Sequence, residues 1–317
     1  MNLFLRKIIL KKVILIVSIM NWGFLGNGFG AFGQNHTPYL NKLEIPKTLE
    51  LGTSDGLLFD FSIESLKNAK QSGVNFLEIS LTKFIKLKHE ERVQLASMIR
   101  ENSQKTGVQL WSVHLPYGND FDVSNINEVE RKKNVKTQKE FIDIAELLGV
   151  KRMVLHPSVD RITSSVRQLH IEALRKSLLE LQDYLKGKSV SLNIENLPRA
   201  CLGNSIEEMA KILEGIPNIG ICADVNHMKG VKPEDFISFF GKRIKMVHMS
   251  DYDFVDEKHW LPGWGDNNWN NIILSLIEAG YDGPFMYEVI KPFTSIEGLK
   301  DNYKNLMNNF NGWVKNI

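Results

Sequence analysis

The sequence predicts an α/β fold, a single (β/α)8 TIM barrel built on parallel strands. Eight short apolar runs alternate with longer amphipathic segments along residues 49–317, and no low-complexity linker interrupts them. This length suits one closed barrel domain. The same alternation could form an open, doubly wound sheet, which would need a glycine-rich phosphate loop after an early strand. The nearest candidate, residues 52–56 (GTSDG), has the wrong spacing for such a loop.

Residues 1–33 precede the barrel and have the layout of a secretory signal peptide. They contain four basic residues and no acidic one, then an apolar run over residues 13–20, then a stretch rich in small residues that ends at residues 31–33 (AFG). The alternative is an uncleaved membrane anchor, but the apolar run is short and is followed by Asn21, Gly23 and Gly26. We therefore expect an exported protein, periplasmic or secreted, without a stable membrane anchor after cleavage. Residues 34–48 form a polar lead-in.

The predicted strands are the eight apolar runs, at residues 49–52, 76–80, 109–114, 152–156, 191–195, 220–224, 244–248 and 285–289. Helical spacing of apolar residues marks segments 90–106, 129–148, 163–186, 205–213, 268–279 and 296–313. Ser205, followed by Glu207 and Glu208, is a helix start signal. Glycines that end helices stand just before four strands, at Gly73, Gly107, Gly149 and Gly280.

Composition and charge narrow the possible functions. With 43% hydrophobic and 24% charged residues, the chain is an ordinary globular protein with a large core. It has 39 Lys+Arg and 37 Asp+Glu, and without the four basic residues of the signal segment the count is 35 against 37, a formal charge of −2. A protein without a basic excess has little electrostatic attraction to nucleic acid, so we expect no such partner. The two cysteines, Cys201 and Cys222, are expected to be free thiols, since Cys222 falls at an inward strand position.

Polar residues stand at the carboxyl ends of six predicted strands, where (β/α)8 barrels place their active sites. In chain order they are His114, His156, Glu195, Asp224, His248 and Glu288, with His227 just after Asp224 and His259 in the loop after His248. One histidine at a strand end usually has a structural role. Several carboxylates and imidazoles that converge on one mouth, however, need a compensating cation.

The predicted metal ligands are Glu195, Asp224, His248 and Glu288. Three carboxylates within a few ångströms repel one another unless a divalent metal lies between them. An oxygen-rich shell with one nitrogen suits Mn, Mg or Co, and zinc is favoured if more imidazoles join. Candidates for additional metal ligands or substrate contacts are His114, His156, His227 and His259. Asn193, Asn196 and Asp251 either orient the ligands or have simple structural roles.

Five motifs at these strand ends resemble those of the xylose-isomerase-like TIM barrels, a superfamily of sugar phosphate isomerases and epimerases that includes the endonuclease IV-type AP endonucleases (family 2). They are NIEN (193–196), DVNH (224–227), VHMSD (247–251), LPGWGD (261–266) and YEV (287–289). The resemblance covers the barrel from about residue 49 onward. Through the ketose 3-epimerases it implies that the four predicted ligands hold one divalent metal ion (Mn, Co, Mg or Zn). It also implies that Glu195 and Glu288 are catalytic and move protons.

The endonuclease branch implies a different possibility, in which more than one zinc is bound. There the same four positions are joined by His114, His156, His227 and an Asp-x-His pair to form a three-zinc cluster. In this sequence the pair is Glu257-Lys258-His259, and its acid is one methylene longer. That departure weakens the expectation of a third metal ion.

Aromatic and basic residues near the predicted mouth are candidate substrate-lining residues. Trp260, Trp264 and Tyr117 could stack on a sugar ring, or the tryptophans could pack as lids. Arg199, just after Glu195, could bind an anionic group of the substrate, or be a solvated loop residue.

Together these features predict a metal-dependent isomerase or epimerase that acts on a small carbohydrate. The protein could form a homo-oligomer. It would abstract a proton next to a carbonyl through a metal-stabilised enediolate. The alternatives are a metal-dependent lyase or hydrolase of (keto)glycosides, an endonuclease IV-like zinc phosphodiesterase, and a sugar-binding barrel without catalysis.

Overall fold

A computed structural model describes residues 49–316 except 160, 229 and 292–293, all within one compact unit. The predicted signal segment and lead-in, residues 1–48, lie outside the described residues. The strands are β1 (Leu51–Ser54), β2 (Phe76–Ser80), β3 (Gln109–His114), β4 (Arg152–Leu155), β5 (Ser191–Glu195), β6 (Gly220–Asp224), β7 (Ile244–His248) and β8 (Phe285–Tyr287). They pair in parallel in the order β7-β6-β5-β4-β3-β2-β1-β8.

The two ends of this sheet meet just beyond β7 and β8. Met249 forms a parallel bridge with Tyr287. The Met249 N–H donates to the Met286 carbonyl at 2.8 Å, and the Glu288 N–H donates to the Met249 carbonyl at 3.2 Å. The strands therefore form a nearly closed barrel, and the predicted (β/α)8 architecture is confirmed.

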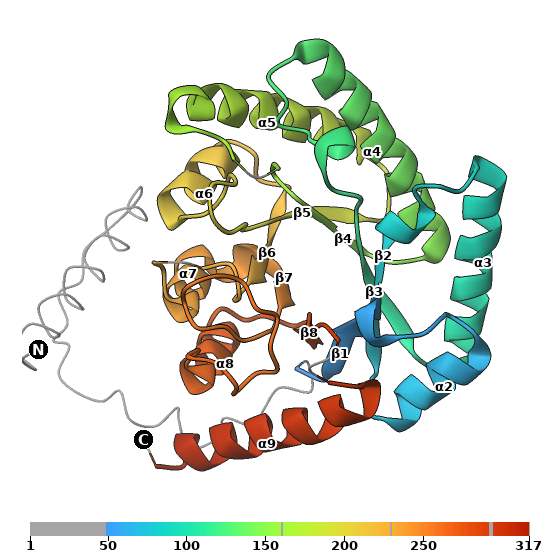
Figure 1. The fold of residues 1–317 in the computed structure, drawn as a ribbon, viewed down its shortest axis with the longest axis vertical. Helices are drawn as coiled ribbons and strands as arrows, with labels where there is room; N and C mark the ends of the chain where they lie inside the picture. The colour runs from blue at the N-terminus through green and yellow to red at the C-terminus, as the bar shows by residue number, and fades with distance from the viewer. Residues whose placement is uncertain (1–48, 160, 229, 292–293, 317) are drawn as a thin grey trace, which may run out of the picture. The chain divides into compact units, whose positions relative to one another are not determined.

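In the described part of the chain, eight α-helices form a ring around the strands (Figure 1). They are α2 (Ile63–Gln71), α3 (His89–Thr106), α4 (Glu128–Leu148), α5 (Ser164–Tyr184), α6 (Ile206–Leu213), α7 (Pro233–Phe240), α8 (Trp269–Glu278) and α9 (Ile296–Val314). Five strands have the predicted bounds, β1 lies two residues later than predicted, and β4 and β8 end earlier. None of these helices combines the length and apolar character needed to cross a lipid bilayer.

Local sequence signals account for where several helices begin and end. The Ser205 hydroxyl accepts a hydrogen bond from the Glu208 N–H at 3.2 Å and caps α6. Gly107 and Gly149 cap the carboxyl ends of α3 and α4 with φ of 73° and 80°, which glycine adopts without steric cost. These three helices therefore begin or end at the residues that the sequence signals predict.

Beneath the strand ends, part of the barrel interior is apolar. Val154, Cys222 and Met246 form a buried cluster there, which agrees with the inward position predicted for Cys222, and Cys201 and Cys222 form no disulfide. Asn193 also points into the lower barrel and donates to the Met153 carbonyl at 3.1 Å. A Cβ at Gly220 would overlap with Asn193 Oδ1, so this neighbour must be glycine. This apolar layer supports the polar residues one step further along each strand.

Candidate metal centre

The four predicted metal ligands meet at the carboxyl ends of β5, β6, β7 and β8. We refer to Glu195, Asp224, His248 and Glu288 as the tetrad. Each offers one ligand atom, and these atoms all lie within 4.8 Å of one another. His248 Nδ1 is 3.1 Å from Glu195 Oε1 and 3.2 Å from Glu288 Oε2. The strand order thus brings together residues that lie far apart in the sequence.

Two carboxylate oxygens of the tetrad fit a cation rather than a protein donor. Asp224 Oδ2 and Glu288 Oε2 are buried and form no hydrogen bond within the described part of the chain. His227 Nδ1 lies 3.2 Å from Asp224 Oδ2, and His248 Nδ1 lies 3.2 Å from Glu288 Oε2, but neither pair has hydrogen-bonding geometry. A buried carboxylate oxygen without a donor is costly. The donor set, three carboxylates and one imidazole, suits a divalent ion such as Mn, Mg or Co.

The pKa values of two of these carboxyl groups are shifted in opposite directions, by burial in one case and by nearby imidazoles in the other. Burial raises the pKa of Asp224 well above its usual range, and Glu288 and Glu195 raise it further against the opposing effect of His227. Burial also acts to raise the pKa of Glu195, but His248 and other nearby imidazoles outweigh it and hold that pKa well below its usual value. Three carboxylates in one buried site cannot all ionise at no cost, which is the electrostatic reason for a cation here.

Glu78, on β2, is a residue of this site that sequence analysis missed. Its Oε1 is 2.9 Å from His248 Nε2, and its Oε2 accepts a hydrogen bond from the Ser112 hydroxyl at 2.7 Å. A carboxylate at Nε2 fixes the His248 ring so that Nδ1 faces the carboxylates of the tetrad. Metal-binding histidines commonly have such a carboxylate at the ring nitrogen that does not bind the metal. The signal in the sequence was an acidic residue at an inward position of the apolar run FLEIS.

Two further groups of possible ligands flank the tetrad. In the first, Nε2 of His114 and Nε2 of His156 lie 3.3 Å and 3.1 Å from the same oxygen of Glu195. In the second, which consists of His227, Glu257 and His259, His227 Nε2 is 3.2 Å from Glu257 Oε2. All five additional candidates from the sequence are therefore close to the tetrad.

In the second flanking group, charge couples His227 to Glu257. Burial lowers the pKa of His227, but Asp224 and Glu257 outweigh it and raise this pKa to about 10. The pKa of Glu257 is lowered to about 2 by hydrogen bonds from His227 and Arg199, against burial. His227 and Glu257 thus form an ion pair that lies directly beside the tetrad.

Asn196 orients two of these residues. Its side-chain amide donates to the Asp224 carbonyl and accepts from the Asp224 N–H, both at 2.8 Å. The backbone carbonyl oxygen of Asn196 is 3.1 Å from His227 Nδ1. Asn196 therefore fixes the end of β6 and the His227 ring, whereas Asn193 lies lower in the barrel and does not contact the tetrad.

Asp251 organises the loop between β7 and α8. Its carboxylate accepts hydrogen bonds from the Gly263 N–H at 2.7 Å, the Asn267 N–H at 3.2 Å and Trp269 Nε1 at 2.9 Å. A Cβ at Gly265 would lie 2.6 Å from Asp251 Oδ1, so the close packing of this loop requires glycine. Asp251 thus acts on the loop rather than on a ligand of the tetrad.

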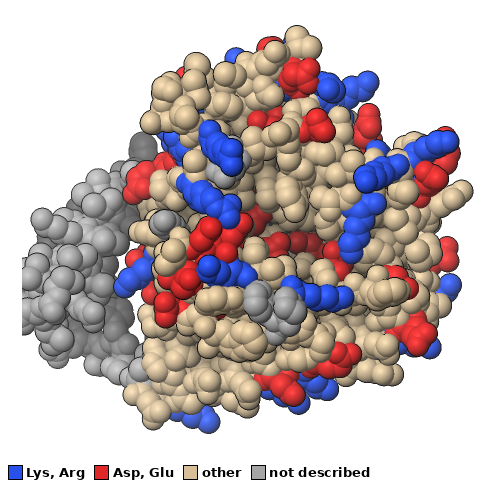
Figure 2. All heavy atoms as spheres, in the orientation of Figure 1, with Lys and Arg blue, Asp and Glu red and all other residues tan. Residues whose placement is uncertain are grey.

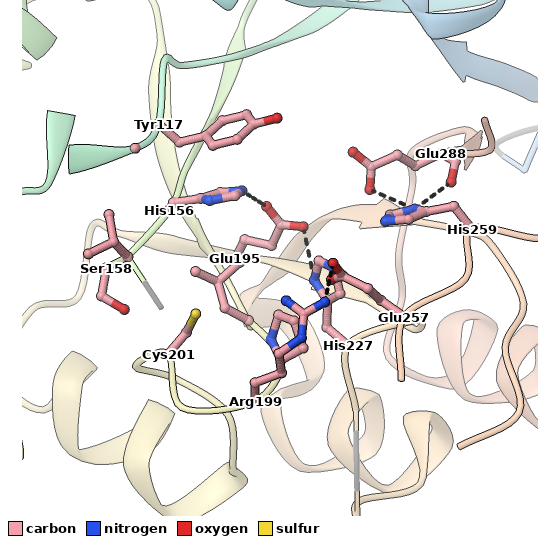
Figure 3. Close-up of a pocket in the computed structure, with 14 residues that line it drawn as sticks. Tyr117, His156, Ser158, Glu195, Arg199, Cys201, His227, Glu257, His259 and Glu288 are labelled. Atoms are coloured by element: carbon pink, nitrogen blue, oxygen red, sulfur yellow. Dashed lines mark hydrogen bonds and ion pairs between the residues drawn. The ribbon is translucent and has the colours of Figure 1, made fainter. Parts of the chain in front are cut away.

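Two members of the tetrad, Glu195 and Glu288, and residues of both flanking groups line a cavity of 320 Å³ (Figure 3). It is lined by residues that include Tyr117, His156, Ser158, Glu195, Arg199, Cys201, His227, Glu257, His259 and Glu288. The Tyr117 ring stacks on His156, with centroids 4.4 Å apart. Acidic side chains lie in the hollow at the middle of this face, and lysine and arginine side chains lie around it (Figure 2).

The predicted substrate-lining residues divide into two pairs. Tyr117 and Arg199 line the cavity, but Trp260 and Trp264 are not among the described residues that do so. The Trp260 backbone pairs with Asp251, and Trp264 is 57% exposed. This part of the loop packs on Asp251, whereas Glu257 and His259, earlier in the same loop, line the cavity.

Arg199 is partly exposed and pairs with two carboxylates of the loop after β7. Its Nη2 is 2.6 Å from Glu257 Oε1, and its Nε is 3.1 Å from Asp256 Oδ1. Arg199 and His259 have φ of 54° and 50°, a region that residues other than glycine rarely adopt. Such backbone strain is concentrated at functional sites in proteins, and both residues line the cavity.

The chain is a (β/α)8 barrel with eight parallel strands, and carboxylates and imidazoles that could hold a cation gather at its strand ends. More narrowly, the family model described as xylose isomerase-like TIM barrel matches residues 66–308, and the chain belongs to this family. The resemblance seen in the sequence motifs is confirmed.

Individual relatives are distant. The chain is 28% identical over 185 residues to the uncharacterized protein MJ1311 of Methanocaldococcus jannaschii, covering 56% of this chain and 63% of that protein. It is 28% identical over 166 residues to the probable endonuclease 4 of Oceanobacillus iheyensis, covering 48% and 54%. The chain therefore spans less than two thirds of the length of either relative.

Solved structures share the fold. A D-tagatose 3-epimerase-like protein superposes with a TM-score of 0.72 at 23% identity, covering 84% of this chain and all of that one. An L-ribulose 3-epimerase superposes with a TM-score of 0.68 at 15% identity, covering 84% and 96%.

Proposed function

We propose that the protein is a divalent-metal-dependent isomerase or epimerase that moves a proton at a carbon next to the carbonyl of a small carbohydrate. The observation that carries the proposal is the placement of two carboxylates, Glu195 and Glu288, on either side of His248 Nδ1 and at the wall of one cavity. The sugar epimerases among the structural neighbours support the same class of reaction. We also propose that the protein is exported.

In this proposal the two glutamates share the proton transfer. Glu195 ends β5 and Glu288 follows β8, with β6 and β7 between them, so they approach the cavity from different sides. A divalent ion held by the tetrad would polarise the substrate carbonyl and acidify the adjacent C–H. One carboxylate can then remove the proton, and the other can return a proton on the other face.

The rest of the cavity suits a small neutral sugar. Its volume, 320 Å³, lies at the small end of ligand pockets, which span about 300–1,000 Å³. The half-exposed Tyr117 ring offers an apolar face for a sugar ring, and His156 behind it keeps the ring in place. Ser158 and His259 supply polar groups for hydroxyls.

Exchange of a substrate C–H proton with solvent tests this proposal. The manganese-loaded protein is incubated with D-fructose, D-tagatose and L-ribulose in deuterated water, and NMR follows deuterium incorporation and new epimers. We expect incorporation into at least one ketose, and its loss when a chelator removes the metal. A metal-loaded, folded protein that exchanges no proton on ketoses or their glycosylated forms would overturn the proposal.

A second candidate, a zinc phosphodiesterase, is favoured by one specific observation. The two flanking groups supply four more imidazoles and Glu257, which would allow a site with several zinc ions. The zinc-loaded protein can be tested with abasic DNA and with bis(p-nitrophenyl) phosphate. Cleavage that stops in His114→Ala, together with no C–H exchange on sugars, would favour this candidate over the first.

A further inference from the structure

A second cavity of 350 Å³ lies next to the one that Glu195 and Glu288 line. Pro198, Arg199, His227 and Glu257 line both cavities and therefore form the boundary between them. The proposed function uses only the first cavity. The second is similar in volume, so each could hold one small ring.

Asn226, which lines the second cavity, has a buried donor without an acceptor among the described residues. Asn226 is 1% exposed, and its Oδ1 accepts hydrogen bonds from the N–H groups of Lys258 at 3.1 Å and His259 at 3.4 Å. Because two N–H donors meet this atom, it must be the oxygen, and Nδ2 is fixed on the other side of the amide. Nδ2 has no hydrogen-bond partner among the described residues.

A second polar group in this cavity is also incompletely satisfied. Tyr252 is 1% exposed, and its hydroxyl forms no hydrogen bond within the described part of the chain, although the backbone of Met228 lies near enough to affect its pKa. Buried polar groups are nearly always hydrogen-bonded, and one left unpaired costs free energy. Two of them at one cavity indicate a ligand that carries hydroxyl groups.

One part of the boundary between the two cavities is the long side chain of Arg199. It is held by ion pairs to Asp256 and Glu257 and is 41% exposed. A partly exposed arginine can rotate without moving the barrel, and exposed ion pairs cost little to break. Movement of Arg199 would open its part of the boundary and connect the two cavities.

We propose that the second cavity binds a second sugar ring, so that the substrate is a glycosylated ketose rather than a free monosaccharide. The inference rests on the proposed function, which places the reacting ring beside the tetrad. Hydroxyls of the second ring would accept from Asn226 Nδ2 and bond with the Tyr252 hydroxyl. Val255 and Pro198 supply apolar contacts for its C–H face.

Binding of matched sugars to the manganese-loaded chain tests the inference. Calorimetry compares D-fructose with maltulose, leucrose and palatinose, in which a glucosyl group is attached to different hydroxyls of fructose. We expect at least one disaccharide to bind about 10-fold more tightly than fructose, the gain of one or two hydrogen bonds. Tyr252→Phe should weaken that disaccharide by about 5-fold and leave fructose unchanged.

A bulkier side chain provides the blocking variant. Val255 is 65% exposed, so Val255→Trp should fold, fill the second cavity and abolish the preference for the disaccharide. Val129→Trp, at a site on α4 that is 74% exposed, is the matched control and should bind as the wild type does.

The outcomes separate this inference from the proposed function. Disaccharides that bind no more tightly than fructose, or a preference that survives Val255→Trp, would overturn the second-ring subsite even if ketoses exchange protons. Tight disaccharide binding that is lost in Val255→Trp, without proton exchange on any sugar, would support the subsite and overturn the proposed reaction.

Discussion

The carboxylate of Glu78 lies 2.9 Å from Nε2 of His248 and joins β2 to β7 across the barrel interior. Both side chains are buried, at 2% and 0% exposure. The opposite nitrogen of the same imidazole faces Glu195 and Glu288. The orientation of a predicted metal ligand is thus set by a strand that contributes nothing to the tetrad itself.

Glu78→Gln should therefore weaken metal binding without preventing folding. The amide keeps the shape of the side chain but removes the charge that favours Nε2–H on His248. Loss of such a supporting group typically lowers metal affinity about 10–100-fold. Calorimetric titration with manganese measures the effect, and Glu101→Gln, an exposed substitution on α3, is the control. An unchanged affinity in Glu78→Gln would show that Glu78 does not support the site.

Glu195→Gln and Glu288→Gln should each abolish most proton exchange on the substrate. A positioned general acid or base contributes about 10²–10⁴-fold to a rate, so we expect a fall of at least about 100-fold. Since both residues belong to the tetrad, metal content is measured on the same samples and separates loss of metal from loss of proton transfer. Undiminished exchange in either variant would contradict the assigned role, and Glu297→Gln at the exposed start of α9 is the control.

Metal binding should stabilise the fold, because it satisfies the unpaired oxygens of Asp224 and Glu288. A ligand at 100 times its dissociation constant raises the free energy of unfolding by about 2.7 kcal/mol. Urea denaturation with manganese and with chelator measures this difference. His248→Ala should show little or no stabilisation by manganese, and an equal response in both proteins would argue against the tetrad as the binding site.

Gly265→Ala should destabilise the loop after β7. The added methyl group would lie 2.6 Å from Asp251 Oδ1 and even closer to the Tyr252 carbonyl, and overpacking of this kind costs about 1–3 kcal/mol. Gly312 lies inside α9, and a methyl group added there would have no neighbour within 4 Å, so Gly312→Ala should stabilise the protein by up to about 1 kcal/mol. Denaturant unfolding of both variants checks the contrast, and equal effects would contradict it.

Much of the barrel was predictable because its signals are local. Apolar runs, helix caps such as Ser205 and terminal glycines such as Gly107 act within a few residues, and they placed most elements correctly. The tetrad was predictable for a topological reason: parallel strands in a barrel all end at one mouth. The position of a polar residue at a strand end, at the mouth of the barrel, can therefore be predicted from the sequence.

The parts that were missed depend on contacts between distant loops and strands. Glu78 lies in the middle of β2, and only the barrel's closure brings it to His248. Trp260 and Trp264 were candidate substrate-lining residues, but they are not among the described residues that line the cavity, and the Asp251 carboxylate organises this part of the loop through the Gly263 N–H and Trp269. Arg199 pairs with Asp256, 57 residues away in the sequence, and with Glu257, 58 residues away. No local pattern in the sequence indicates this pairing.

The central claim is that the tetrad holds a divalent metal ion, and metal content per chain tests it most directly. Wild-type protein and His248→Ala are purified without chelator and analysed by mass spectrometry of metals, with circular dichroism to confirm folding. We expect one tightly bound equivalent of manganese, cobalt or zinc in the wild type and its loss in the variant. A folded wild-type protein without metal, or a variant that retains the full equivalent, would contradict the claim.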